Sequence, residues 1–218
     1  MSQIKRAMKL FEGKAELLCF GEAFLQGFDA LCWEYDTDQL TALDLSSETI
    51  TRLRDWTVRY GVSLIMGYIE KDGEKLYSSC VALSNGEIIH NYRRISKGWK
   101  EYAITDGHYC EGSDTRPFTL NGRDISLTLC GDLWDFPDKF RTENLLIWPV
   151  YVNYTAEEWN SGILDEYAAQ AALAAADVLM VNPLDNEPVN YGGSFHFHCG
   201  KVAASLAFGT EDILIVDI

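Results

Sequence analysis

The feature that most constrains the fold is a series of short apolar segments, rich in β-branched residues, that are joined in two different ways. Some are separated by tight Asn-Gly turns, at Asn85-Gly86 and Asn121-Gly122, which predict β-hairpins. Others are separated by amphipathic stretches long enough for a helix, which predict β-α-β crossovers. Hairpins and crossovers in one chain favour an α/β fold, and we expect two mixed sheets packed face to face with helices outside.

Hydrophobic periodicity sets the expected positions of the elements. The helix over residues 46–60 has both ends marked, because Ser46 or Ser47 can cap its start and Gly61 ends it. Further helices are predicted over 2–15 and 156–176, and strands over 16–24, 63–70, 75–84, 87–96, 116–120, 123–132, 145–152, 177–184, 193–208 (as a hairpin) and 212–218.

Composition narrows the choice of partners. With 218 residues, 47% of them hydrophobic, the chain can form one domain, residues 1–218, around a substantial core. Its formal charge of −15 repels phosphate backbones and anionic lipids, so we expect no nucleic-acid or membrane partner. No apolar run approaches the ~20 residues that cross a bilayer, and no signal-peptide pattern opens the chain. Six cysteines without CxxC spacing indicate reduced thiols in a cytoplasmic protein.

The segment LTLCGDLWDFP carries a candidate nucleophile. Cys130 ends an apolar strand, so its thiol can project into a cleft above the sheet. Gly131 follows it and can offer a backbone N–H to an oxyanion, with no side chain to block close approach. A cysteine in a strand is more often a small core hydrophobe, so this segment alone does not predict catalysis.

A single carboxylate in the segment ELLCFGEAFLQGF is a candidate general base. Glu22 directly follows a short buried strand and is surrounded by apolar residues. Burial raises the pKa of a carboxylate, which suits a base that works near neutral pH. A solvated turn glutamate is the alternative interpretation, and this feature alone favours neither.

A basic run over residues 91–107 lies between these two segments. A cation beside a cysteine lowers the pKa of the thiol and stabilises a tetrahedral oxyanion. Arg94 ends a strand, and Lys97 and Lys100 lie in the loop that follows, so some of them can point into the same cleft. A basic run is by default a solvated face. It is the convergence of three segments at three strand ends that predicts a catalytic site.

Three segments, FGEAFLQGF, YRRISKGWKE and LCGDLWDFP, occur in this order and resemble the signature regions of the carbon-nitrogen hydrolase family, the nitrilase-like amidases. The segment YGGSFHFHCGKVAAS resembles the C-terminal half of that family. The resemblance implies an α-β-β-α sandwich, a Glu-Lys-Cys triad often assisted by a second glutamate, no cofactor, and commonly a homodimer. From the resemblance we also expect the strand that usually precedes the family's first helix to be absent here.

The resemblance assigns roles residue by residue. Glu22 is the general base, Cys130 the nucleophile and Glu101 the candidate second glutamate. Where relatives usually have the lysine of the triad, this chain has Arg94. We favour Lys100 as the substitute cation, because it adjoins Glu101 and an ion pair would hold both at the cleft, with Arg94 and Lys97 as alternatives.

Other residues complete the expected site. The metal tract suggested by His196 and His198 is interpreted as ordinary hairpin polarity, so no metal is expected. Five residues in or beside loops at the presumed cleft are candidate pocket walls: Trp99, Tyr109, Trp134, Tyr151 and Asn153.

The predicted function is hydrolysis of a non-peptide carbon-nitrogen bond, in a small amide, carbamoyl or nitrile substrate, through a cysteine thioester. Two alternatives belong to other classes. Arginine at the usual lysine place also fits a binding or assembly protein that keeps the fold without the chemistry. A hydrolase with a metal on His196 and His198 would instead lose activity to chelators.

Overall fold

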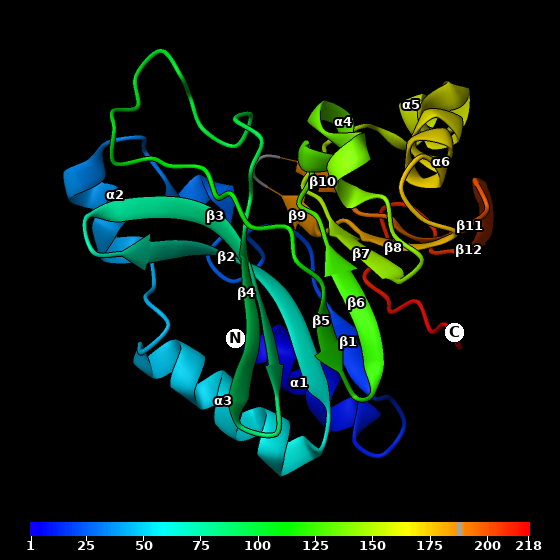
Figure 1. The fold of residues 1–218 in the computed structure, drawn as a ribbon, viewed down its shortest axis with the longest axis horizontal. Coiled ribbons are helices and arrows are strands. Elements are labelled where there is room, and N and C mark those ends of the chain that lie inside the picture. Colours follow the sequence, from blue (N-terminus) through cyan, green and yellow to red (C-terminus); the bar gives the residue numbers. More distant parts are fainter. Residues whose placement is uncertain (187–188) are drawn as a thin grey trace.

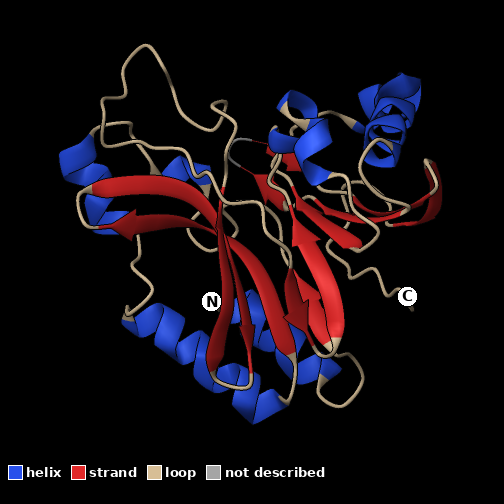
Figure 2. Cartoon of the chain, viewed as in Figure 1, coloured by secondary structure: helices blue, strands red, loops and turns tan. Residues whose placement is uncertain are grey.

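Two mixed β-sheets lie face to face, and helices cover their outer surfaces (Figures 1 and 2). The computed structural model describes residues 1–186 and 189–218. One sheet has the order β1-β2-β3-β4 and the other the order β12-β11-β8-β7-β6-β5, with a separate pair, β10-β9. The strands are β1 (Leu17–Cys19), β2 (Ser63–Asp72), β3 (Lys75–Ser84), β4 (Glu87–Arg93), β5 (Phe118–Leu120), β6 (Arg123–Leu127), β7 (Leu145–Pro149), β8 (Asp177–Val181), β9 (Leu184–Asn186), β10 (Val189–Tyr191), β11 (Ser194–His198) and β12 (Lys201–Ser205).

Both large sheets combine parallel and antiparallel pairs, as the mixture of turns and crossovers predicts. Strand β1 runs parallel to β2, and β6, β7 and β8 are parallel to one another, while the hairpin pairs are antiparallel. The two Asn-Gly sequences form the turns of β3–β4 and β5–β6. All four turn residues have positive φ: 50° at Asn85, 81° at Gly86, 52° at Asn121 and 78° at Gly122. Turns of this kind match the twist of the flanking strands, so the hairpin predictions are confirmed.

Helices pack on the outside of both sheets. Helices α1 and α3 cover the four-stranded sheet, and α5 and α6 lie over the six-stranded sheet (Figure 1). The helices are α1 (Ser2–Phe11), α2 (Tyr35–Thr41), α3 (Glu48–Tyr60), α4 (Asp132–Asp135), α5 (Ala156–Glu158) and α6 (Leu164–Ala172), with 3-10 turns η1 (Phe28–Ala30) and η2 (Pro137–Phe140) and a π-helical turn η3 (Trp159–Ile163).

The ends of α3 are where its sequence signals place them. The Ser47 hydroxyl accepts a hydrogen bond from the Ile50 N–H, and Gly61 ends the helix in the left-handed conformation with φ 62°. The buried stripe of this helix, which includes Ile50 and Leu53, packs together with α1 in a cluster against the four-stranded sheet. A second cluster fills the space between the sheets and continues under α6, and it includes the fully buried Trp148 and Trp159.

Several predicted boundaries are wrong. The long helix over 156–176 ends at Ala172 and contains a π-helical turn, in which Gly162 has a φ of 132°. Of the strand predicted over 16–24, only Leu17–Cys19 forms a strand, β1. Residues 212–218 form no strand among the described residues, although Ile213 packs against the cluster between the four-stranded sheet and helices α1 and α3. Apolar alternation shows that a segment has a buried face, but a strand also needs a free sheet edge beside it.

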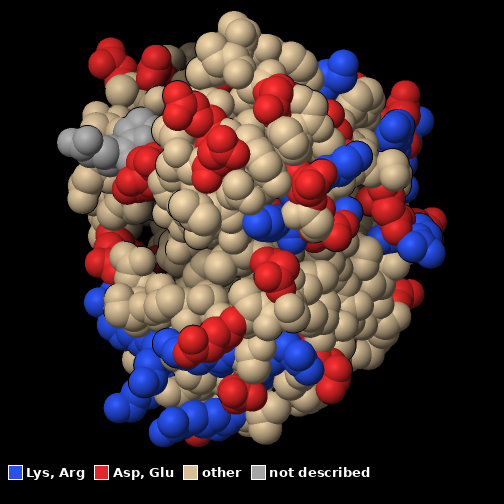
Figure 3. Space-filling view, turned by 90° about the vertical axis from the view of Figure 1, so that its left-hand side faces the viewer, with Lys and Arg blue, Asp and Glu red and all other residues tan. Residues whose placement is uncertain are grey.

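Charge is distributed unevenly over the surface. Figure 3 shows the side of the molecule that lies on the left in Figure 1, where acidic side chains are scattered over the upper part. Basic side chains gather along the lower part, at the height of α1 and α3. The net charge of −15 is therefore the sum of surface regions that differ in sign. Within the described residues, no helix combines the length and apolar character needed to span a bilayer.

The packing of α3 gives a stability prediction. Leu53 is fully buried, while Val58 on the same helix is 62% exposed. Leu53→Ala should lower the free energy of unfolding by about 2–5 kcal/mol, because it removes buried methyl groups and leaves a cavity. Val58→Ala, the matched control, should change it by no more than about 0.5 kcal/mol. Urea unfolding followed by circular dichroism measures both, and equal losses would contradict the assigned core face of α3.

Candidate active site

Glu22 lies in the turn after β1, between the two sheets. Its backbone N–H donates to the Val150 carbonyl at 3.2 Å, just beyond the end of β7, while the Gly67 N–H of β2 donates to the Gly21 carbonyl at 3.2 Å. The turn is thus tied to both sheets. The side chain of Glu22 is 1% exposed, so the alternative of a solvated turn glutamate is wrong.

Glycine at position 67 allows the Glu22 turn to lie directly on β2. A Cβ at Gly67 would lie 2.4 Å from the Gly21 carbonyl oxygen, 2.6 Å from the Ala23 nitrogen and 2.6 Å from the Glu22 Cα. Since these are backbone atoms, no side-chain rotation could relieve the overlap. The depth at which Glu22 is buried therefore depends on a missing side chain in the neighbouring strand.

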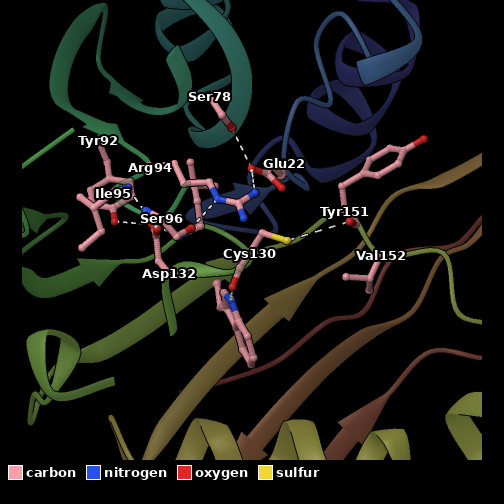
Figure 4. A network of polar contacts seen from close by, with 12 residues as sticks. Glu22, Ser78, Tyr92, Arg94, Ile95, Ser96, Cys130, Asp132, Tyr151 and Val152 are labelled. Atoms are coloured by element: carbon pink, nitrogen blue, oxygen red, sulfur yellow. Dashed lines mark hydrogen bonds and ion pairs between the residues drawn. The ribbon is translucent and has the colours of Figure 1, made fainter. Parts of the chain in front are cut away.

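The carboxylate of Glu22 has one oxygen fully engaged and one free. Oε1 accepts hydrogen bonds from the Ser78 hydroxyl at 2.7 Å and from Arg94 Nη1 at 3.0 Å (Figure 4). Oε2 is buried and has no hydrogen-bond partner within residues 1–186 and 189–218. An unpaired carboxylate oxygen in a buried site is costly. Its presence points to a proton that this oxygen takes up or to a substrate group that it contacts.

Arg94 follows β4 and is held from both sides. Its Nη1 pairs with Glu22, its Nε donates to the Ser96 hydroxyl at 2.7 Å, and its side chain is 5% exposed. Burial opposes the charged form, but the charges of Glu22 and Asp132 outweigh it and raise the pKa of the guanidinium above its usual value. Arg94 is therefore a fixed positive charge in the site.

Cys130 lies just past β6, in a strained backbone conformation. Its N–H donates to the Pro149 carbonyl at 2.9 Å and its carbonyl accepts from Trp148 Nε1 at 2.9 Å. These bonds hold a φ of 44°, which is uncommon for a residue with a side chain. The sulfur points into the space beside the Glu22 carboxylate and the Arg94 guanidinium, 4.0 Å from the Tyr151 carbonyl oxygen (Figure 4). The three side chains meet at one place.

The thiol of Cys130 is protonated at neutral pH. Burial, followed by the charge of Glu22, raises its pKa to about 12, and the charge of Arg94 opposes this shift. A thiol in this state needs a base to take its proton before it can attack. The neighbouring carboxylate has the free oxygen to do so.

Asp132 organises the segment that carries Arg94. Its fully buried carboxylate accepts hydrogen bonds from the Tyr92 hydroxyl at 2.5 Å and from the backbone N–H groups of Ile95 (3.0 Å), Ser96 (2.6 Å) and Leu129 (3.1 Å). The bonds from Tyr92, Ile95 and Ser96 join the end of β4 to the segment that holds the cysteine (Figure 4), and the bond from Leu129 lies within that segment. Sequence reasoning missed this role, and the signal that could have found it is an acidic residue two positions after the cysteine in an apolar segment.

Gly131 gives Arg94 the room that it needs. A Cβ there would lie 2.5 Å from Arg94 Nη2 and 3.2 Å from the Ser96 hydroxyl. Its φ of −65° is ordinary for any residue, so the requirement for glycine is one of space. The guanidinium thus lies directly against the backbone that follows Cys130.

The other predicted charged residues lie in different surroundings. The ammonium of Lys100 pairs with Glu111 at 2.7 Å and also donates to the Tyr109 carbonyl, so the ion pair that we expected with Glu101 is formed with Glu111 instead. Glu101 is exposed. Lys97 is exposed and lies 5.9 Å from the centre of the Tyr102 ring. Of the candidate cations, Arg94 is the one that pairs with Glu22.

The predicted pocket residues are spread over several regions. Tyr151 lies beside Cys130, with its ring against Phe28 and its hydroxyl donating to Asp185 at 3.2 Å. Trp99 and Tyr109 are buried in a cluster with Trp33. Trp134 is 40% exposed and packs edge-on against Tyr167. Asn153 is exposed.

Comparisons with known proteins identify the family and the fold of this chain. The family model for carbon-nitrogen hydrolases matches residues 1–218. A nitrilase of Pyrococcus abyssi is 30% identical over 130 residues, which cover 59% of this chain and 47% of that protein. A glutamine-dependent NAD(+) synthetase of Thermotoga maritima is 26% identical over 132 residues, which cover 59% of this chain and 22% of that protein.

A solved carbon-nitrogen hydrolase superfamily protein from Xanthomonas campestris has the same fold, with a TM-score of 0.75 at 16% identity; the match covers 97% of this chain and 80% of that one. The matched segments span less than half the length of each of the two curated relatives. The family match extends over the whole sequence, and the chain belongs to the carbon-nitrogen hydrolase family.

The contact between Gly131 and Arg94 gives a second prediction. Gly131→Ala should displace the guanidinium, which raises the pKa of the Cys130 thiol further and slows its alkylation by iodoacetamide. The expected slowing is about tenfold for each unit of pKa. Peptide-resolved mass spectrometry measures the rate at Cys130 alone. Gly107→Ala is the control, because a Cβ there meets no atom within 4 Å. Equal rates in both variants would show that Arg94 does not depend on this space.

Proposed function

We propose that this protein hydrolyses a non-peptide carbon-nitrogen bond, in a small amide, carbamoyl or nitrile substrate, with Cys130 as nucleophile. The observation that carries the proposal is the convergence of the Cys130 thiol, the Arg94 guanidinium and a buried Glu22 carboxylate that keeps one oxygen unpaired. Membership of the carbon-nitrogen hydrolase family supports the class of bond, and a related nitrilase supports nitriles among the substrates.

The first step is attack by the thiolate. Glu22 takes the proton of the Cys130 thiol through its free oxygen, and the sulfur then adds to the carbonyl carbon of an amide. The oxygen of that carbonyl becomes an oxyanion, which the Gly131 N–H and the Arg94 guanidinium can stabilise. The carbon-sulfur bond forms while the carbonyl π bond opens, so the step leaves a tetrahedral intermediate.

The second step releases the amine and then the acid. Arg94 stays charged throughout, because a guanidinium does not readily give up a proton. The proton that the leaving amine needs therefore comes from Glu22, and the carbon-nitrogen bond breaks to leave a thioester on Cys130. Water, deprotonated by Glu22, then attacks the thioester and releases the carboxylic acid and the thiol. No metal or organic cofactor enters these steps.

The role of second glutamate stays with Glu101 as a sequence-based prediction, and Tyr151 is the pocket residue that we place nearest the substrate. We further propose a homodimer, which is common in the family, located in the cytoplasm and acting on a small molecule. The −15 charge disfavours nucleic acid and anionic membranes as partners.

A binding or assembly function without catalysis is the second candidate. It is favoured by Arg94, which stands where relatives usually have lysine and is held by Glu22 and Ser96 on both sides. In that case the site would bind a small amide or acid without turning it over.

Turnover and trapping separate the two candidates. Wild-type protein incubated with a panel of small amides and nitriles should release ammonia or amine and accumulate an acyl adduct visible in the intact mass. Cys130→Ala should abolish both, and Glu22→Gln should lower turnover by about 10²–10⁴-fold, the usual contribution of a general base. Cys110→Ser is the control for loss of a thiol elsewhere. Binding of a panel compound without turnover or adduct would favour the second candidate.

A further pair of variants identifies the cation. Arg94→Gln should lower turnover by about 10²–10³-fold, because it removes a charge aimed at the oxyanion. Lys100→Gln should change it only severalfold, since the Lys100 ammonium pairs with Glu111. Arg94→Lys keeps a positive charge beside Glu22, so it shows whether the charge alone is sufficient for turnover. Circular dichroism checks that each variant is folded. A large loss in Lys100→Gln alone would return the cation role to Lys100.

A further inference from the structure

A polar cluster lies on the six-stranded sheet, on β8 and β11, and the hydrolysis described above does not use it. His196 and His198 alternate along β11, so both side chains lie on the same face of the sheet. The antiparallel register pairs His198 with Asp177 and His196 with Leu179. Asp177 is therefore directly opposite one histidine and diagonal to the other, within reach of both. The expectation of ordinary hairpin polarity did not include this carboxylate.

Both imidazole rings point at a single oxygen atom. His196 Nε2 and His198 Nδ1 each lie 2.8 Å from Asp177 Oδ1, and the three atoms all lie within 4.8 Å of one another. A nitrogen lone pair facing a carboxylate oxygen would be repelled, so without a cation each contact needs a proton on the ring nitrogen. Two protons thus converge on one oxygen. One divalent cation can replace both of them.

The donor set suits a zinc-like ion. Two imidazole nitrogens and one carboxylate oxygen are ligands that zinc and its transition-metal neighbours prefer, with further positions left for water. Metal–ligand bonds of about 2.0–2.1 Å place tetrahedral ligands about 3.3 Å apart. The present spacing of 2.8 Å needs to open by about 0.5 Å. The cluster is open to solvent, since the side chains of His196, Asp177 and His198 are 12%, 31% and 58% exposed.

A neighbouring group holds one of the rings in the required orientation. The second nitrogen of His198, Nε2, lies 3.6 Å from the Cys199 sulfur, which can accept its proton. A metal-ligating histidine usually donates its other N–H to a nearby acceptor, which fixes the tautomer. Cys199 and Gly200 form the tight turn to β12, with φ of 50° and 74°. The turn therefore positions the acceptor.

The cluster is separate from the candidate active site. Asp177 is the first residue of β8 and His198 the last of β11, whereas Val181, at the other end of β8, accepts a hydrogen bond from Val150 beside Glu22. Four residues of strand place the two regions about 13 Å apart along β8. An ion here would join β8 to β11 without contacting the substrate.

We propose that Asp177, His196 and His198 form a binding site for one zinc-like divalent cation, which links β8 and β11 at the end of the sheet remote from Cys130. The ion takes the place of the two N–H groups that face Asp177, and the proton of each neutral ring moves to the other ring nitrogen. The effect of the ion is to stabilise the folded chain by mass action.

Calorimetric titration of the purified protein with Zn²⁺ alone tests the site. We expect one equivalent to bind at pH 7.5. His198→Ala and Asp177→Asn should each reduce the affinity at least about tenfold. His108→Ala is the matched control, because His108 pairs with Asp106 at 2.9 Å as a single histidine, and it should leave the affinity unchanged.

Two further measurements guard against binding elsewhere. With Zn²⁺ present, the melting temperature should rise in the wild type and not in His198→Ala, which also shows whether that variant folds. With Co²⁺ as a probe, histidine and carboxylate ligands give no thiolate charge-transfer band in the near ultraviolet. Affinity unchanged by both His198→Ala and Asp177→Asn would overturn the proposal. A thiolate band that disappears in Cys199→Ser would overturn the three-ligand assignment.

Discussion

The buried ion pair between Glu22 and Arg94 is the interaction on which the rest of the site depends. The two side chains are 1% and 5% exposed, and removing such charges from water costs several kcal/mol for each ion. Ser78 on the carboxylate and Ser96 on the guanidinium offset part of that cost. A buried pair adds little net stability compared with apolar packing. Its value lies in holding a carboxylate and a positive charge beside the Cys130 thiol.

Close backbone approach makes this pair possible. Glu22 is buried deeply because Gly67 has no side chain to block the turn on β2, and Arg94 reaches the Cys130 segment because Gly131 has no side chain. Asp132 then fixes the relative positions of the two loops by accepting hydrogen bonds from two backbone N–H groups and one hydroxyl at the end of β4. Each sheet supplies part of the site, so the packing of the two sheets decides its geometry.

An arginine in place of the usual lysine changes the proton chemistry more than the charge. A guanidinium supplies a permanent positive charge and several donors, but it does not exchange protons near neutral pH. With the pKa of the Cys130 thiol raised to about 12, all proton transfers in the proposed mechanism fall to Glu22. The unpaired oxygen of that carboxylate is consistent with this single role.

Local sequence alone determined the elements and the strand ends that carry chemistry. Asn-Gly turns, a capped helix and apolar runs are encoded by neighbouring residues, which is why the hairpins, α3 and the layered fold could be predicted. Contacts between distant residues were decided by the tertiary structure: Ser78 on Glu22, Arg94 rather than Lys100 beside it, and Asp177 between the two histidines of β11. Such contacts depend on strand register and sheet packing, which bring together side chains 56 and 72 positions apart and leave no local signal.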